Sequence, residues 1–162
     1  DRDMKYAKQA ISFMEKSNWK DAKKAASKAR AKSIYDFIQW RHLLTTGNRA
    51  TFTEYKQFIE RVKDYPRIDR VRYLGEHKIN SKNHTKNEII QWFDKHPPLS
   101  GFGKMMIGDA LLSKNKDTAI NLIKEGFITA DLSKNDLIFF RKKFKKYLNS
   151  SDYIKRADYL AW

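Results

Sequence analysis

The chain has 162 residues, of which 41% are hydrophobic and 14% aromatic, and it carries a formal net charge of +15. This apolar content is enough for one folded domain and excludes intrinsic disorder, while six glycines and three prolines are too few for a loop-rich β-sandwich. The absence of cysteine excludes disulfides, thiolate catalysis and cysteine-based zinc sites, and no apolar run is long enough to span a membrane.

The charge arises from 34 basic and 19 acidic residues. An electrostatic field of this sign attracts anions such as nucleic acid, acidic lipid or a polymer that carries carboxylates. A second explanation is the composition of an AT-rich genome, in which lysine is the default solvent-facing residue. The sequence leaves both explanations open.

Helical periodicity runs through nearly the whole sequence. Apolar residues recur at spacings of three and four, as in Tyr55, Phe58 and Ile59, and no stretch alternates as a half-buried strand would. Together with the start and stop signals, this pattern predicts ten helices, at residues 4–16, 18–31, 33–46, 53–65, 67–79, 86–96, 101–114, 117–130, 134–148 and 151–161.

Start and stop signals separate these helices. Asn18 and Ser133 are predicted to cap helix N-termini, and Gly47-Asn48 to end a helix. Pro66 is expected in the first turn of the next helix, where its missing N–H costs nothing. Two segments have the spacing of a capping box, in which a hydroxyl and a carboxylate each satisfy an unpaired backbone N–H: Thr51-x-x-Glu54 and Thr85-x-x-Glu88.

The predicted helix starts lie about 16 residues apart, so that two consecutive helices form a unit of about 33 residues, as in tetratricopeptide repeats. This spacing predicts an all-α fold, a superhelical array of short antiparallel helix pairs that resembles a tetratricopeptide solenoid. Small residues such as Ala22 and Ala26 allow close packing of neighbouring helices. A compact helix bundle is the alternative, because short loops suit both. No low-complexity linker interrupts residues 1–162, which predicts a single domain.

No group of residues has the pattern of a catalytic, cofactor or metal site. The four histidines lack the spacing that places two ligands on one helix face, and we expect them at the surface or between helices. Gly101-x-Gly103 has no preceding strand to present a phosphate, and no serine lies in a nucleophile elbow. We therefore expect no catalysis by this chain, no cofactor and no metal.

An ordered set of motifs runs from the middle of the chain to its C-terminus. Its members are Phe58-Ile59, Tyr65-Pro66-Arg67, Leu74-x-Glu76, Trp92-Phe93, Pro97-Pro98-x-x-Gly101, Ala110-Leu111-Leu112, Ala119-x-x-Leu122-Ile123-x-x-Gly126-Phe127 and Asp152-Tyr153-x-x-Arg156-x-Asp158-x-Leu160-x-Trp162. This order resembles the helical N-terminal domain of soluble lytic transglycosylases over residues 18–162. The chain departs from the family at Phe127, Tyr153 and Ala161, where the family usually has Trp, His and Leu.

The resemblance implies a periplasmic parent enzyme of cell-wall turnover, a lyase that cleaves peptidoglycan between N-acetylmuramic acid and N-acetylglucosamine and leaves a 1,6-anhydromuramoyl end. In that family the acid/base is a glutamate in a lysozyme-like C-terminal domain, within an E-S-x-F motif. No glutamate of this chain precedes a serine, so the resemblance implies a non-catalytic superhelical domain that positions the enzyme on glycan strands and contacts the missing C-terminal part of its parent. The chain shows no signal peptide, and the same is expected of a mature protein from which the signal peptide has been removed.

The candidate binding site is a run of five cations, Arg141, Lys142, Lys143, Lys145 and Lys146. In the predicted helix, Arg141 and Lys145 share one face, as do Lys142 and Lys146, and this basic face would attract the free carboxylates of peptidoglycan stem peptides. The simpler interpretation is a solvated helix face opposite the stripe of Phe140 and Phe144.

A different functional class stays open: a basic helical domain that binds nucleic acid or a protein partner in the cytoplasm. The charge favours it, but no helix has a basic recognition surface interleaved with Asn or Gln as base readers.

The last predicted helix has an apolar stripe that includes Ile154, Ala157 and Leu160, and Trp162 follows it. A solenoid normally closes with a unit whose outer face is polar. We therefore expect exposed apolar surface near the C-terminus, which further helices of the parent would cover. The alternative is that Trp162 folds back onto the helix of Phe140.

Overall fold

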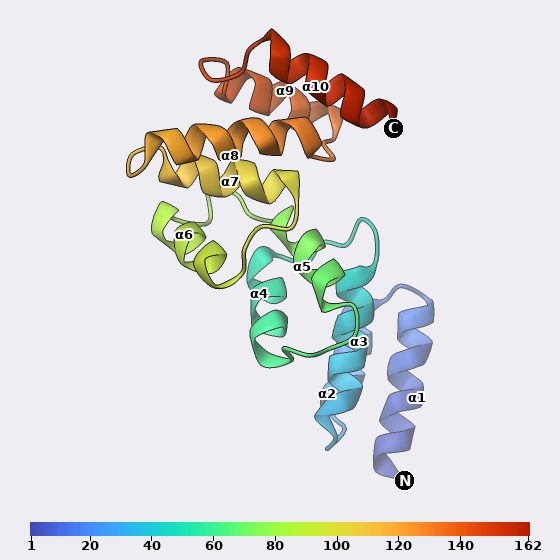
Figure 1. Cartoon of the computed structure of the whole chain (residues 1–162). Coiled ribbons are helices and arrows are strands. Elements are labelled where there is room, and N and C mark those ends of the chain that lie inside the picture. The colour runs from blue at the N-terminus through green and yellow to red at the C-terminus, as the bar shows by residue number, and fades with distance from the viewer. The chain divides into compact units, whose positions relative to one another are not determined.

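The structure is a computed structural model that describes all 162 residues, and it contains ten α-helices and no strand (Figure 1). The helices are α1 (Arg2–Glu15), α2 (Trp19–Ser27), α3 (Lys32–Leu44), α4 (Phe52–Arg61), α5 (Ile68–Glu76), α6 (Lys86–Lys95), α7 (Gly101–Leu111), α8 (Lys116–Thr129), α9 (Lys134–Lys143) and α10 (Ser150–Ala161). The predicted all-α fold is confirmed. None of the helices combines the length and apolarity needed to cross a lipid bilayer.

The chain divides into two compact units, which we name unit 1 (Asp1–Gly75) and unit 2 (Glu76–Trp162). The boundary falls at the end of α5, whose last residue, Glu76, belongs to unit 2. The expectation of one continuous domain stays a prediction.

In unit 1, α1, α2 and α3 pack on one another around a small apolar core. Three alanines of α2, Ala22, Ala25 and Ala26, are buried there, and their small side chains let the helices approach closely, as the sequence predicts. The rings of Trp19 and His42 stack 4.9 Å apart and join α2 to α3. This places His42 between helices, as expected.

The capping predictions are confirmed. Thr51 with Glu54 and Thr85 with Glu88 form both capping boxes, and Asn18 and Ser133 accept hydrogen bonds from the first turns of α2 and α9. The end of α3 is also close to its predicted place. There the Asn48 amide donates to the carbonyl of Thr45 at 3.0 Å, which satisfies an acceptor that the helix leaves unpaired.

The prediction for Pro66 is wrong. The helix before it ends at Arg61, and α5 begins only at Ile68, so Pro66 lies in the connecting turn. A tertiary contact fixes this turn, because the indole N–H of Trp40 on α3 donates to the Pro66 carbonyl at 2.7 Å. The helix pattern of residues 62–65 could not reveal that bond.

In unit 2, the closest helix pair is α7 with α8, whose backbones meet at glycines. A Cβ atom on Gly126 of α8 would lie 2.5 Å from the carbonyl oxygen of Gly101 and 2.8 Å from Cγ of Met105 on α7. Both neighbours are part of a helix that is buried on nearly every side. Only glycine therefore allows this approach.

We expect Gly126→Ala to lower the free energy of unfolding by about 2 kcal/mol, because overpacking a close-packed interior costs roughly 1–3 kcal/mol. Alanine favours a helix over glycine by about 1 kcal/mol, so the clash must reverse the usual sign. Urea denaturation measures the change. Asn121→Ala, at an exposed position of α8, is the matched control and should lose no stability. A Gly126→Ala protein at least as stable as the wild type would contradict the close approach.

The prediction of a helix to residue 148 is also wrong, because α9 ends at Lys143. The ammonium of Lys124 on α8 donates to the Tyr147 carbonyl at 3.0 Å and to the Asp152 carboxylate at 2.7 Å. These bonds hold the chain in a turn after Phe144, from which Asn149 begins α10 with a capping box. Here too, a tertiary contact ends a helix before the residue at which its apolar stripe ends.

The expected exposure of apolar residues near the C-terminus is confirmed. On α10, Ile154 is 62% exposed and Leu160 58%, and on α9 Phe139 is 53% exposed. Trp162 is fully exposed and does not fold back onto Phe140.

Candidate functional site

Two candidate regions present polar groups to a ligand: a run of cations in unit 2 and a polar pocket in unit 1. The first, which we name the basic segment, comprises residues 141–146. Its cations come from the last turn of α9 and from the turn that follows, and all five are exposed. Phe144 and Leu148 are buried, and they anchor the segment to unit 2 from within.

The cations of the basic segment differ in their contacts. The guanidinium of Arg141 lies 5.3 Å from the centre of the Tyr153 ring, and the Lys143 ammonium lies 3.7 Å from a carboxylate oxygen of Asp109. Lys142 and Lys145 make no ion pair within the chain. The sequence from residue 137 to residue 151 contains no acidic side chain, so the positive charge is poorly compensated locally.

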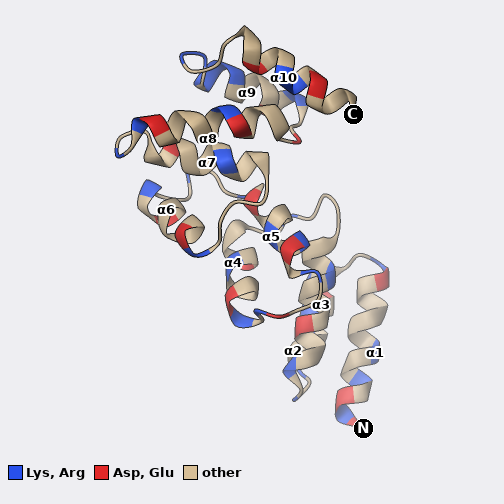
Figure 2. Ribbon diagram, in the orientation of Figure 1, with Lys and Arg blue, Asp and Glu red and all other residues tan.

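The expected pairing of these cations on two helix faces is wrong, because the helix stops before Lys145 and Lys146. The five charges instead follow the end of α9 and its turn as one exposed stretch, and Figure 2 shows the blue of basic residues concentrated there. Such a stretch can follow an extended anionic polymer, whereas it does not enclose a small molecule. Its role in binding stays a prediction.

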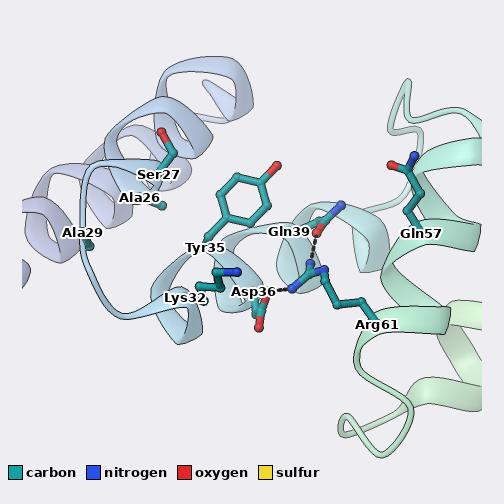
Figure 3. A pocket seen from close by; sticks show the side chains of 9 residues that line it. All are labelled: Ala26, Ser27, Ala29, Lys32, Tyr35, Asp36, Gln39, Gln57 and Arg61. Carbon is teal, nitrogen blue, oxygen red and sulfur yellow. Dashed lines mark hydrogen bonds and ion pairs between the residues drawn. The ribbon is translucent and has the colours of Figure 1, made fainter.

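The second region is a pocket of about 350 Å³ formed by α3 and α4 and by the end of α2 (Figure 3). Its lining residues are Ala26, Ser27, Ala29, Lys32, Tyr35, Asp36, Gln39, Gln57 and Arg61. One wall of the pocket is a fixed polar network. Arg61 on α4 pairs with the carboxylate of Asp36, and its other terminal nitrogen donates to the Gln39 side chain at 2.8 Å.

Three polar groups of the pocket have no hydrogen-bond partner in the chain: the Lys32 ammonium, the Tyr35 hydroxyl and the Gln57 amide. Figure 3 shows the Tyr35 ring in the middle of the pocket, with Lys32 beside it and Gln57 on the far side. The pocket thus combines an aromatic face with free donors and acceptors.

No protein-family model, curated protein or solved structure matches the chain.

Sequence reasoning missed the pocket. Lys32, Tyr35, Asp36 and Gln39 recur at i, i+3, i+4 and i+7, so they share one face of α3. This polar stripe was a usable signal, but a polar helix face ordinarily indicates solvent. Its partner on α4, Arg61, lies more than twenty residues further along the chain, and only the fold brings the two together.

The motif residue Arg156 has a structural role. It is 8% exposed, and its guanidinium donates to the carbonyls of Phe127 at 2.6 Å and Ala130 at 2.8 Å, which closes the C-terminal end of α8. Burial lowers the pKa of Arg156, and the nearby carboxylate of Asp131 opposes this shift. Arginine nevertheless stays charged at neutral pH.

The motif residue Glu76 is the most buried charged side chain, at 1% exposure. Its carboxylate accepts hydrogen bonds from the backbone N–H groups of Leu99 and Ser100, at 2.9 and 2.8 Å, and from the Ser100 hydroxyl at 2.6 Å. Burial raises the pKa of Glu76, and the bonds from Ser100 and Leu99 act against this rise. The carboxylate is thus occupied by the N-terminus of α7 and cannot reach a substrate.

Proposed function

We propose that the chain is a non-catalytic helical domain of a periplasmic lytic transglycosylase, which positions the enzyme on peptidoglycan glycan strands during cell-wall turnover. The observation that carries this proposal is the basic segment, an exposed run of five cations with no acidic residue between positions 137 and 151. Stem peptides of peptidoglycan carry free carboxylates, and a field of this sign attracts them.

The motif residues support the same proposal. In unit 2, two buried residues of α10 join it to α8. Asp152 accepts a hydrogen bond from Lys124, and Arg156 donates to the carbonyls of Phe127 and Ala130. This is a packing role, as a scaffold requires. The Tyr153 ring packs edge-on against Phe127, with centres 5.2 Å apart, so two of the three departures from the family motif keep an aromatic contact.

We further propose that the helices form a superhelical array of antiparallel pairs. Support comes from the contacts of consecutive helices, α1 with α2, α2 with α3, α6 with α7, and α7 with α8. An array of this kind offers more surface for its length than a compact bundle does, which suits the binding of a long polymer.

The test is co-sedimentation of the chain with purified sacculi. A variant with Lys142, Lys145 and Lys146 changed to Gln should bind about tenfold more weakly at low salt, because each lysine near an anionic surface contributes up to about 1 kcal/mol before screening. Wild-type binding should also fall as salt shortens the screening length. The chain alone should release no anhydromuropeptides.

The matched control changes three other exposed lysines, Lys8, Lys20 and Lys63, to Gln. It removes the same net charge, so a specific role of the basic segment requires that this control binds nearly as the wild type does. Equal losses in the two variants would reduce the role to net charge. An exposed run of cations also suits phosphates, so tight binding of duplex DNA with no binding of sacculi would favour the nucleic-acid alternative.

A further inference from the structure

We infer that the pocket of unit 1 binds one sugar residue that carries a carboxylate, with Tyr35 as the stacking surface and Lys32 as the partner of the carboxylate. The identification of this sugar as a unit of peptidoglycan rests on the proposed function. The pocket lies in a different unit from the basic segment, so it would add a ring-specific contact to a charge-driven one.

The size of the pocket fits a single ring. Its volume of about 350 Å³ lies near the lower end of the range for small-molecule sites, roughly 300–1,000 Å³. The floor consists of small side chains of α2 and the following loop, Ala26, Ser27 and Ala29, which leave room above them.

Tyr35 is suited to stack on a sugar. Its ring is half-buried and packs against the core of unit 1, so its orientation is held before a ligand arrives. The apolar C–H face of a pyranose can cover such a ring, while the free hydroxyl of Tyr35 bonds to the rim. The apolar ring and the polar hydroxyl of Tyr35 therefore match the apolar face and the polar rim of a sugar.

The polar groups around Tyr35 match hydroxyl and amide groups. Asp36 and Gln39 hold Arg61 in place, so its remaining N–H donors have a fixed direction and lose little entropy on binding. The Gln57 amide is free to donate and accept from the opposite side. Sugars and their N-acetyl groups offer both kinds of partner.

The charges around the pocket select a monoanion. Lys32 and Arg61 contribute two positive charges and Asp36 one negative charge, which leaves a net charge of +1. Since Asp36 already pairs with Arg61, the uncompensated charge is that of Lys32. A phosphate dianion carries twice the charge that Lys32 can neutralise and is repelled more strongly by Asp36, so a carboxylate fits better than a phosphate.

The experiment is a titration of the full chain, labelled with ¹⁵N, with N-acetylmuramic acid and with N-acetylglucosamine, which lacks the carboxylate. We expect the side-chain amide signal of Gln57 to shift with both sugars, and N-acetylmuramic acid to bind about fivefold more tightly, as one exposed charge contact allows. Lys32→Gln should abolish this preference, and Lys63→Gln, at an exposed position outside the pocket, should keep it.

Variants of the stacking surface complete the test. Tyr35→Phe should bind within about threefold of the wild type and Tyr35→Ala at least about tenfold more weakly, because only the second removes the ring. Tyr35 also packs against the core, so Tyr35→Ala counts as a binding result only where its backbone ¹⁵N spectrum matches that of the folded wild type. An unshifted Gln57 signal, or a preference that survives Lys32→Gln, would overturn the inference.

The two proposals fail separately. If the wild type sediments with sacculi while its Gln57 signal ignores both sugars, the pocket inference is wrong and the proposed function stands. If Gln57 responds to N-acetylmuramic acid while sacculi are not bound, the pocket inference stands and the proposed function is wrong.

Discussion

Replacing Arg156 with methionine is expected to lower the free energy of unfolding by about 3 kcal/mol, because each charged hydrogen bond contributes roughly 1.5–3 kcal/mol and buried partners are left behind. The guanidinium donates at 2.6 and 2.8 Å to two carbonyls at the end of α8 and lies 5.2 Å from the Phe127 ring. Methionine restores the apolar stem but supplies no donor, so the carbonyls of Phe127 and Ala130 lose their bonds. Urea denaturation followed by circular dichroism measures the loss.

Two further variants separate the hydrogen bonds from the charge. Arg156→Lys should recover less than half of the loss, because both bonds come from Nη1 at the end of the guanidinium, and the shorter lysine side chain does not place its ammonium at that position. Lys155→Met, at the exposed neighbouring position of α10, should change stability by no more than about 0.5 kcal/mol. A lysine variant as stable as the wild type would show that charge alone suffices.

The number and order of the helices could be predicted because their signals are local. A capping box such as that of Thr51 and Glu54 needs only four residues, and its two hydrogen bonds form wherever the helix starts. The apolar stripe that includes Tyr55, Phe58 and Ile59 is equally local, and all three side chains are buried as the period requires. A helix feature can be predicted from the sequence where the residues that determine it lie within one or two turns of each other.

The helix ends were predicted less well because distant residues decide them. The bond from Trp40 to the Pro66 carbonyl and the bond from Lys124 to the Tyr147 carbonyl each stabilise a turn where periodicity continues a helix. Both donors lie more than twenty residues from their acceptors. No local pattern encodes such a pair, and the free energy of one tertiary hydrogen bond is enough to outweigh the small propensity for another helical turn.

The candidate sites follow the same division. The basic segment is contiguous in sequence, so composition alone reveals it. The pocket needs α3 and α4 together, and its members, such as Tyr35 and Gln57, belong to stripes that are polar enough to be taken for solvent-facing. Sequence reasoning gave Glu76 and Arg156 only as members of a motif and did not predict their burial. A charged residue is expected at the surface unless its bonding partners are known.

Glu76→Ala should also lower the free energy of unfolding by about 3 kcal/mol, because the N–H groups of Leu99 and Ser100 and the Ser100 hydroxyl all lose their acceptor. The Ser100 hydroxyl accepts in turn from the N–H of Gly103 at 2.8 Å, so the first turn of α7 depends on this carboxylate. Gly103 has no room for a side chain, since a Cβ atom there would lie 2.3 Å from Oε1 of Glu76. The helix start and the carboxylate therefore stabilise each other.

Glu76→Gln tests which force dominates at this carboxylate, because glutamine keeps the shape and removes the ionisation. Burial raises the pKa of Glu76 above its ordinary value of 4.5, so the folded chain holds this proton more tightly than the unfolded chain does. The resulting stabilisation is complete below the unfolded pKa and is lost as pH rises through the folded pKa. The wild type's advantage over Glu76→Gln, measured by urea denaturation, should therefore shrink as the pH rises above 4.5. An advantage that grows with pH would mean that the hydrogen bonds from Ser100 and Leu99 outweigh the cost of burying the charge.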